Sequence, residues 1–383
     1  MTETPRGRII ALDLLRGFVL AVIAIDHIAR FPNLFELASG RGILWVSAAE
    51  GFFIISGLLV GYLYTRRMQR SPLAAVKKIW RRALLLYALS IFWTLTFTLW
   101  AWAASGNAGV KGGVWQGDSA GLVWQLLTLQ YVYGWADFLA YYTLFMLVAP
   151  LAVWLISKKQ AWLVVVLSLA VWVFFRSASF ALAWQVLFML AMVAGAYLPQ
   201  LEAFARTLPE KVRSVSFYAV VMSMAMFLLI SAAVVIVLPF LAKHQLLGTL
   251  QVPVTSLLAS LNSPGGLLSW FNKDSLPLGR LIAAFFVFTA FYLLFRRFET
   301  QLLAATKGVL EILGKQSLFV YCTQAVMVFV VNLLLPPRLN PLLSTLLTAS
   351  LLVLLYWLAK GRESSRPRSP QDAQLTLANT PES

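Results

Sequence analysis

The sequence has little charge, one cysteine and two histidines among its 383 residues. Charged residues make up 12% of it, whereas a soluble domain has about 25%. Hydrophobic residues make up 60%, and the mean hydropathy is +0.78. This composition excludes an ordinary soluble enzyme, a disordered protein and a coiled coil. One cysteine cannot form an internal disulfide. The scattered histidines and cysteine do not form a ligand set, so we expect no metal.

Sequence motifs of several enzyme classes are also missing. The chain has no GxxxxGK[ST] phosphate loop, no GxGxxG after a strand and no GxSxG nucleophile elbow. The last of these absences disfavours a Ser-His-Asp hydrolase. The net charge of +16 would indicate nucleic acid in a soluble protein. Here the basic residues lie mostly between apolar segments, where they set topology, so we expect no nucleic-acid partner.

Apolar stretches of about 20 residues recur along the chain, and each can cross a hydrocarbon core of about 30 Å. Strand alternation is absent, which disfavours a β-barrel. The pattern predicts an all-α polytopic membrane protein, a bundle of about ten transmembrane helices in the lipid bilayer. The apolar region 119–134 is predicted to be an interfacial or re-entrant helix. The ten predicted spans are 9–29, 43–65, 83–104, 136–156, 161–175, 182–198, 215–238, 281–295, 316–335 and 341–359.

Lysine and arginine are distributed unequally between the two sets of loops. Ten spans place both termini on one side, and the loops of that side carry 22 Lys and Arg against 8 on the other. Because positive charge marks cytoplasmic loops, both termini are predicted to be cytoplasmic. Residues 1–359 are predicted to form the integral membrane domain. Residues 360–383 are polar and rich in Pro and Ser, and are predicted to be a disordered cytoplasmic tail.

Charge inside the predicted spans is concentrated near the start of the chain. A charge at the bilayer centre costs at least about 2.5–3.5 kcal/mol on insertion scales, so it marks a functional region. The first span contains Asp13, Arg16, Asp26 and His27, and the second contains Glu50. The later spans are almost free of charge. The first two spans are therefore the predicted functional region.

Arg16 and His27 are eleven residues apart in the first span. At about 100° per residue they lie on one stripe of the helix, roughly 16 Å apart along its axis. With a cytoplasmic N-terminus, Arg16 lies in the inner half and His27 towards the outer end. The stripe predicts a site that receives an anionic substrate from inside and transfers a proton nearer the outside.

Glu50 is the better candidate for orienting the His27 imidazole. Asp26 is the weaker one, because adjacent side chains do not face each other on a helix. Glu50 shares a face of the second span with Gly57 and Gly61. These two glycines form a small-xxx-small pair that lets another helix approach closely.

Each of these charged residues also has a structural interpretation. Asp13 and Arg16, at i and i+3, can form an ion pair. Asp26 and His27 can lie in the outer interface, and the second-span glutamate can be a structural hydrogen-bond partner. The basic residues within 66–82 are interpreted as topology determinants. They lie on the same side as Arg16 and could also attract a polyanionic cofactor.

Arg16, ten intervening residues and His27 resemble the R-X10-H signature of the membrane acyltransferase-3 superfamily. The wider context resembles the OpgC family, which is linked to succinylation of osmoregulated periplasmic glucans. An early LD-LRG block is also similar to the heparan-glucosaminide acetyltransferase-like proteins. The blocks that carry the resemblance are LDLLRG (12–17), DHIARFPN (26–33), AAEGFFIISGLLVGYLY (48–64), ADFLAYYTLFMLVAP (136–150), AWQVLFMLAMVAG (183–195) and LGKQSLFVYCTQ (313–324).

The resemblance implies a ten-helix acyltransferase domain over residues 1–359, in the inner membrane of a bacterium. It implies an enzyme whose co-substrate is cytoplasmic acyl-CoA, either succinyl-CoA or acetyl-CoA. The acyl group would pass to a hydroxyl of a periplasmic or surface glycan. His27 matches the motif histidine and would act as general base, since an unperturbed imidazole titrates near pH ~6.5. Glu50 or Asp26 would fix its tautomer.

Arg16 matches the motif arginine and would bind an anionic part of the donor, either a phosphate or a succinyl carboxylate. Asp13, Ser56 and Asp137 are further candidates for substrate binding, and all three lie within matching blocks. Direct transfer and an acyl-histidine intermediate are both open. Aromatic residues on the outer side are candidates for sugar recognition: Trp115, Trp135, Trp184 and Trp270.

Two other functions fit the same residues. A transporter or flippase of an anionic sugar or lipid would use the buried Arg16/His27 stripe as its pathway. Visible sequence repeats, common in transporters, are missing. An inactive relative that scaffolds glycan synthesis would tolerate His27→Ala. Consumption of acyl-CoA separates the first function from the other two.

Overall fold

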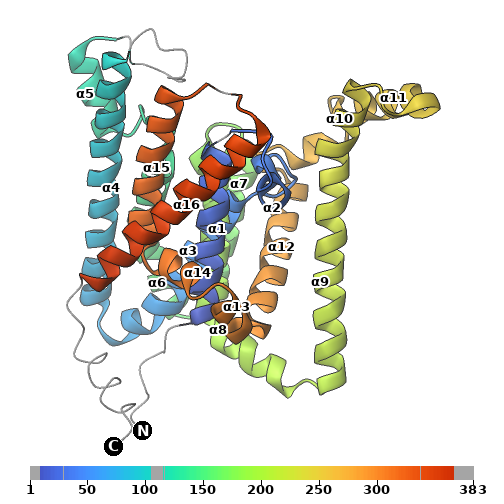
Figure 1. Cartoon of the computed structure of the whole chain (residues 1–383). Coiled ribbons are helices and arrows are strands. Elements are labelled where there is room, and N and C mark those ends of the chain that lie inside the picture. The colour runs from blue at the N-terminus through green and yellow to red at the C-terminus, as the bar shows by residue number, and fades with distance from the viewer. Residues whose placement is uncertain (1–8, 29, 105–114, 116, 337, 366–383) are drawn as a thin grey trace, which may run out of the picture.

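The computed structural model describes residues 9–28, 30–104, 115, 117–336 and 338–365, and every regular element in them is helical (Figure 1). This confirms the all-α prediction for the described residues. The long helices are α1 (Ile10–Ile28), α3 (Ala48–Arg70), α4 (Pro72–Ala103), α6 (Asp137–Ser157), α7 (Ala161–Phe175), α8 (Phe180–Thr207), α9 (Glu210–Ala232), α12 (Leu278–Arg297), α15 (Ser317–Leu334) and α16 (Pro341–Ser364). Shorter elements join them: α2 (Glu36–Ser39), η1 (Gly40–Gly42), α5 (Ser119–Leu127), η2 (Ala233–Val237), α10 (Leu238–Lys243), η3 (Gly248–Leu250), α11 (Gln251–Asn262), η4 (Leu267–Phe271), α13 (Glu299–Ala305) and α14 (Val309–Lys315).

Each predicted span overlaps one long helix, although several helix ends differ from the predicted ones. In the described residues, eight helices are long and apolar enough to cross a membrane. The two other long helices are α7, which has 15 residues, and α1, which carries Asp13, Arg16 and Asp26. The protein is therefore a membrane protein, while the count of ten spans stays a prediction. Helix α5 has nine residues, about 13 Å at 1.5 Å per residue, which is too short to cross.

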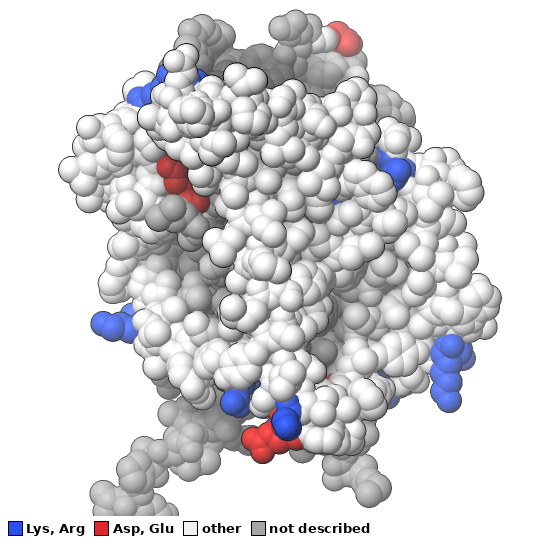
Figure 2. Space-filling model, turned by 90° about the vertical axis from the view of Figure 1, so that its right-hand side faces the viewer, with Lys and Arg blue, Asp and Glu red and all other residues white. Residues whose placement is uncertain are grey.

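The first residue of α1 and the last residue of α16 lie at the same end of the bundle, the lower end in Figure 1. We call it the inner end, following the orientation predicted from the loop charges, and the opposite end the outer end. Figure 2 shows a face of the molecule whose broad middle is uncharged. Most Lys, Arg, Asp and Glu side chains on this face lie towards its two ends. An uncharged belt between charged ends is what a bilayer requires of a protein surface.

Helix α3 lies in the middle of the bundle and packs closely on α8. In the most apolar stretch of α3, 78% of the residues are buried. In that of the helical run Glu210–Lys243, at the edge of the bundle, the share is 11%. A Cβ at Gly57 would lie 2.1 Å from the Phe188 carbonyl oxygen, and one at Gly61 would lie 1.8 Å from that of Met192. The predicted close approach at the glycine pair is confirmed, and α8 is the helix that makes it.

The inner half of α1 packs equally closely on α14. A Cβ at Gly17 would lie 1.9 Å from the Leu310 carbonyl oxygen, and one at Gly314 would lie 1.9 Å from that of Asp13. Nearby, α16 continues to Ser364, so the region predicted as a tail begins in helix. The rest of that tail, 366–383, lies outside the described residues. Lys315 contacts Glu363 at 3.7 Å and so ties the end of α16 to α14.

Candidate functional site

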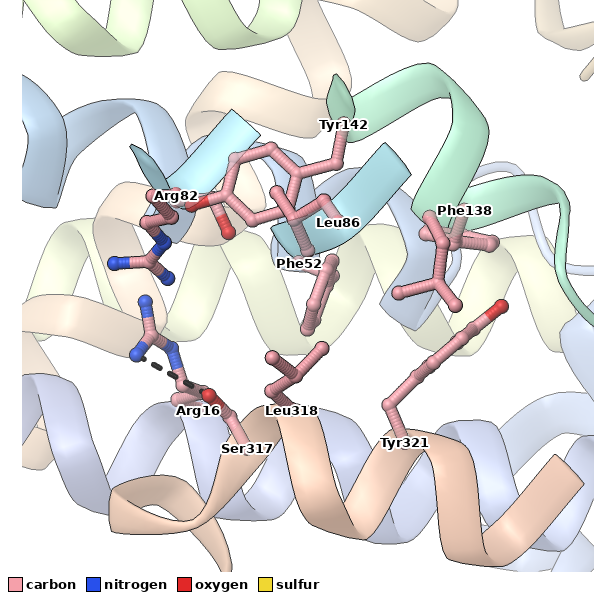
Figure 3. A pocket seen from close by; sticks show the side chains of 11 residues that line it. Arg16, Phe52, Arg82, Leu86, Phe138, Tyr142, Ser317, Leu318 and Tyr321 are labelled. Carbon is pink, nitrogen blue, oxygen red and sulfur yellow. Dashed lines mark hydrogen bonds between the residues drawn. The ribbon is translucent and has the colours of Figure 1, made fainter. Parts of the chain in front are cut away.

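Arg16 lies at one end of a small internal pocket in the inner half of the bundle (Figure 3). Its Nη1 lies 3.5 Å from the Ser317 hydroxyl oxygen at the start of α15. The cavity has a volume of about 20 Å³, room for about one water molecule. Its lining comes from α1, α3, α4, α6 and α15, and consists of Arg16, Phe52, Ser56, Arg82, Leu86, Phe138, Leu139, Tyr142, Ser317, Leu318 and Tyr321.

A second arginine shares this end of the pocket. Figure 3 shows the Arg82 guanidinium, from α4, pointing towards that of Arg16. The Arg82 group also lies over the Tyr142 ring, 5.5 Å from its centre. Two guanidinium groups that point at one another in a low-dielectric pocket repel, and an anion between them would be bound by both. The pocket therefore has the electrostatics of an anion site.

Arg82 is a site residue that the sequence analysis assigned only to membrane topology. It is one of seven basic residues within 66–82, and charge counting cannot separate them. Its position holds a usable signal, because it is the last basic residue before the apolar run of α4. It is therefore the basic residue of α4 that lies furthest along the helix towards the apolar part of the bundle. Its neighbour Arg81 is exposed and does not line the pocket.

Ser56 and Asp13, both predicted to bind substrate, are placed differently. Ser56 is buried and lines the same pocket as Arg16, so the structure brings these two together. Asp13 is buried in the first turn of α1 and is not among the residues that line the pocket. Its backbone carbonyl oxygen faces Gly314, at the close contact between α1 and α14.

Aromatic rings close the other end of the pocket. Phe138 and Tyr321 lie opposite the arginines in Figure 3, with ring centres 5.9 Å apart, and Phe52 packs on both. The Tyr321 hydroxyl donates a 3.0 Å hydrogen bond to the Trp135 carbonyl oxygen. Asp137, directly before Phe138 in the chain, interacts electrostatically with Tyr321. This aromatic end therefore separates the arginine pocket from Asp137.

A group of half-buried polar side chains lies at the outer end of the bundle. Asp26 and His27 occupy the last turn of α1, and Asp137 occupies the first turn of α6, where its Oδ1 accepts 2.7 Å from the Phe138 N–H. Lys273, before α12, interacts electrostatically with all three. Three of the predicted site residues are thus within the electrostatic influence of one lysine, which the sequence analysis counted as a loop charge.

Asp26 and His27 differ in what surrounds their side chains. The Asp26 carboxylate lies against Ser39 and against the turn at Gly42, where a Cβ would be 3.0 Å from its Oδ2. Among the residues that the structure describes, no hydrogen bond or ion pair holds the His27 side chain. The His27 side chain is half-buried.

Glu50 contacts residues other than His27, its predicted partner. Its Oε1 accepts from Arg280 Nε at 2.5 Å, and its Oε2 accepts from the Ser47 N–H at 3.1 Å and hydroxyl at 2.6 Å. Glu50 is fully buried and Arg280 is 3% exposed. The expected contact between Glu50 and His27 is not among the hydrogen bonds of the described residues. Here the carboxylate instead caps α3 and neutralises a buried arginine.

Arg30 holds the outer end of α1 against the outer end of α15. Its guanidinium donates to the carbonyl oxygens of Ile28, Val331 and Leu335 at 3.1–3.3 Å and to Asn332 Oδ1 at 3.4 Å. Burial lowers the pKa of Arg30, although an arginine stays protonated at neutral pH. These bonds tie the turn that follows His27 to the outer end of α15.

One of the tryptophans proposed for sugar recognition is wrongly placed. Trp184 is fully buried, and its ring stacks on Phe180 at 4.4 Å. Its indole N–H donates 3.0 Å to the Lys273 carbonyl oxygen, so it cannot contact a sugar outside the bundle. Trp270 is exposed and borders a surface groove of about 440 Å³ with Trp172 and Arg176. Its role in sugar binding stays a prediction.

Comparison with known proteins adds one finding to this geometry. A family model described as OpgC protein matches residues 8–366, which is nearly the whole chain. No curated protein matches the chain, and no solved structure matches it. The match covers the arginine pocket, the outer polar group and the buried ion pair between Glu50 and Arg280.

Proposed function

Because the chain belongs to the OpgC family, we propose that it is a membrane O-acyltransferase that transfers a succinyl or acetyl group from acyl-CoA to a glycan hydroxyl. The donor is bound from the inner, cytoplasmic end, and the acceptor glycan is bound at the outer, periplasmic end. The placement in the membrane acyltransferase-3 superfamily and in a bacterial inner membrane belongs to the same proposal. It rests on the R-X10-H spacing of Arg16 and His27.

One observation carries the proposal. A single helix, α1, connects a pocket with two facing guanidinium groups to an outer group of polar side chains that includes His27. An acyl-CoA has two matching parts. Its phosphates are anionic, and its reactive thioester lies at the far end of a neutral arm. An enzyme that acts across a membrane needs such separate places for the anion and for the proton transfer.

His27 is proposed to be the general base. It takes the proton from the sugar hydroxyl as that oxygen attacks the thioester carbonyl, and the carbon–sulfur bond breaks to release the thiolate of coenzyme A. The proton on His27 then passes to that thiolate, which balances the reaction. If an acyl-histidine forms first, the same imidazole is the nucleophile and the sugar attacks in a second step. Asp26, one residue away, is proposed to support the imidazole.

Arg16 and Arg82 are proposed to hold phosphate groups of the donor. Charge-assisted hydrogen bonds from two guanidinium groups suit a phosphate, and the surrounding aromatic side chains raise their strength by excluding water. The cavity of about 20 Å³ cannot contain a nucleotide. Binding therefore requires the aromatic side chains at the end formed by Phe138 and Tyr321 to move, which opens the way from the arginines towards His27.

The test is acyl transfer in membranes that contain the full chain. Labelled succinyl-CoA and acetyl-CoA are supplied with extracted periplasmic glucans, and the native chain is compared with His27→Ala and Arg16→Ala. His244→Ala is the matched control, because this other histidine follows α10 and lies away from α1. We expect label on the glucan with the native chain and His244→Ala, and a large loss with His27→Ala at equal membrane abundance.

Two results would overturn the proposal. If no acyl-CoA is consumed while a labelled anionic sugar or lipid crosses the membrane in an Arg16-dependent way, the chain is a transporter. If the glucan is labelled equally by His27→Ala, the imidazole is not the base.

A further inference from the structure

The segment 267–280, which runs from η4 into the first turn of α12, is fixed to the outer end of the bundle at several points. The Trp184 indole N–H donates 3.0 Å to the Lys273 carbonyl oxygen, and that of Trp172 donates 2.9 Å to the Leu276 carbonyl oxygen. Leu276 itself is fully buried. Two buried indoles therefore hold the backbone on both sides of a short exposed stretch that begins at Lys273.

A second anchor holds the two ends of this segment. Arg280, paired with Glu50, donates 2.8 Å to the Phe271 carbonyl oxygen. The Phe271 ring stacks on Trp45, with centres 4.4 Å apart and planes 8° from parallel. These contacts fix the backbone of the segment, so the place of Lys273 at the outer end is built into the fold.

The segment lies next to the turn that packs on Asp26, because Arg280 Nη1 also donates 3.4 Å to the Leu44 carbonyl oxygen, two residues after Gly42. Lys273 is the basic residue of its exposed stretch. Its side chain is exposed, and it interacts electrostatically with Asp26, His27 and Asp137. Within the described part of the chain its ammonium makes no hydrogen bond or ion pair. Two other outer basic residues are occupied, since Arg280 binds Glu50 and Arg30 binds carbonyl oxygens of α15. The backbone that carries Lys273 is thus held at the outer end of the bundle, and the lysine charge is available to a ligand there.

The spacing of Arg16 and His27 along α1 indicates which part of the donor the Lys273 ammonium can reach. Arg16 and His27 are roughly 16 Å apart along the helix axis. The carboxylate of a succinyl group is only a few bonds from the thioester carbonyl. When that carbonyl lies at His27, the carboxylate is therefore beyond the reach of Arg16 and close to the outer polar group. Arg16 can then bind a phosphate, and the carboxylate needs a different cation.

We propose that Lys273, held at the outer end of the bundle by the anchored segment 267–280, binds the carboxylate of the transferred acyl group and makes the enzyme selective for dicarboxylic acyl donors. The proposal deepens the acyltransferase function given above and rests on it. Asp26 and Asp137 would repel a further carboxylate in this place, and the lysine offsets that repulsion. An ammonium on a flexible stem suits this task, because it acts as a point charge without a fixed bidentate geometry.

The test is the donor preference of Lys273→Met, a substitution that keeps most of the length of the side chain and removes its charge. The kcat/KM for succinyl-CoA and for acetyl-CoA is measured with one glucan acceptor for the native chain, Lys273→Met and Lys273→Arg. We expect Lys273→Met to lose about tenfold to hundredfold with succinyl-CoA, the range for a hydrogen bond between charged groups, and to change little with acetyl-CoA. Lys273→Arg should keep most of the preference.

The ratio between the two donors does not depend on how much protein is folded, so a poorly folding variant still gives an answer. Lys243→Met is the matched control, because Lys243 is an exposed lysine at the end of α10 in the same outer connection. It should leave the ratio unchanged. An equal loss with both donors by Lys273→Met, or a native chain that prefers acetyl-CoA, would overturn the selectivity proposal while acyl transfer stands.

Two further outcomes would each have a distinct meaning. If the loss by Lys273→Met depends on anionic substituents of the acceptor glucan rather than on the donor, the lysine binds the acceptor and the proposal is wrong. If the native chain uses neither donor, the acyltransferase function itself has failed, which is a different result from an unchanged donor ratio.

Discussion

The two ends of α1 hold their charged groups in opposite ways. At the inner end, Arg16 and Arg82 are enclosed with aromatic and aliphatic side chains around a cavity of about 20 Å³. At the outer end, Asp26 and His27 are half-buried. All four side chains are half-buried, so the two ends differ in charge rather than in burial. Two guanidinium groups that face each other favour an anion between them, whereas an imidazole beside a carboxylate can exchange protons.

The anchoring of the two ends differs as well. The outer end depends on a buried ion pair, between Glu50 and Arg280, and on indole hydrogen bonds to the segment 267–280. The inner end depends on close backbone contact between α1 and α14 at Gly17 and Gly314, and its ion pairs are partly exposed. Electrostatic substitutions should therefore disturb the outer end more than the inner end.

The largest effect is expected from His27→Ala. Removing a general base lowers the rate of a proton-transfer step by about 10²–10⁴-fold. The change should appear in kcat, with the KM for the donor nearly unchanged, because the arginine pocket is intact. Steady-state kinetics in membranes measure both. Since His27 is half-buried at the outer end, added imidazole should restore part of the rate, and a KM effect without a kcat effect would contradict its role.

The second effect concerns the buried ion pair. Arg280→Met leaves the fully buried Glu50 carboxylate without its cation and should cost about 3–5 kcal/mol of stability. Adding Glu50→Gln removes that charge while keeping a side chain that can cap α3, so the double variant should regain much of the loss. Thermal unfolding in detergent measures both variants.

The inner end offers a control for this comparison. Arg296 pairs with Glu299 at 3.0 Å, and its side chain is 41% exposed. An exposed ion pair contributes about 0–1 kcal/mol, so Arg296→Met should change the unfolding temperature little. Equal destabilisation by Arg296→Met and Arg280→Met would show that the two ends do not differ in the way proposed here.

The third effect is expected from Arg82→Ala. Losing one guanidinium at the pocket should raise the KM for acyl-CoA by about tenfold to hundredfold, with a smaller change in kcat. Arg81→Ala is the matched control, because its side chain is exposed on the same turn of α4. An acyl-pantetheine donor without phosphates should be used equally by the native chain and Arg82→Ala. A similar loss with that donor would show that Arg82 does not act by binding phosphate.

Helix content was predictable because a bilayer imposes long apolar runs, but those runs do not set the helix ends. The span predicted as 83–104 belongs to α4, which starts at Pro72 with a charged first half. The span predicted as 182–198 belongs to α8, which continues through Pro199 to Thr207. Apolarity ends where the membrane ends, whereas a helix continues as long as its backbone hydrogen bonds form.

The candidate site could be predicted only where its residues lie on one helix. Spacing on one helix fixes relative position, so the Arg16/His27 stripe could be derived from a single segment. Contacts between helices depend on packing that no single segment encodes. Glu50 and Arg280 are 230 residues apart, and nothing in either segment indicates the other. The same holds for Lys273, whose place at the site depends on indoles from other helices.

The smallest effect is expected at the N-termini of α3 and α4, which lie at opposite ends of the bundle. The Ser47 hydroxyl donates 2.6 Å to Glu50 Oε2 at the outer end, whereas Ser71, the residue before α4 at the inner end, makes no side-chain capping bond. Losing a capping serine costs about 1 kcal/mol, so Ser47→Ala should lower the unfolding temperature slightly and Ser71→Ala should not. Because Ser47 also satisfies the oxygen of Glu50 that Arg280 leaves free, the loss should shrink in the Glu50→Gln background. If it stays the same, the capping bond is independent of the ion pair, and the outer end is held by separate contacts rather than by one connected polar network.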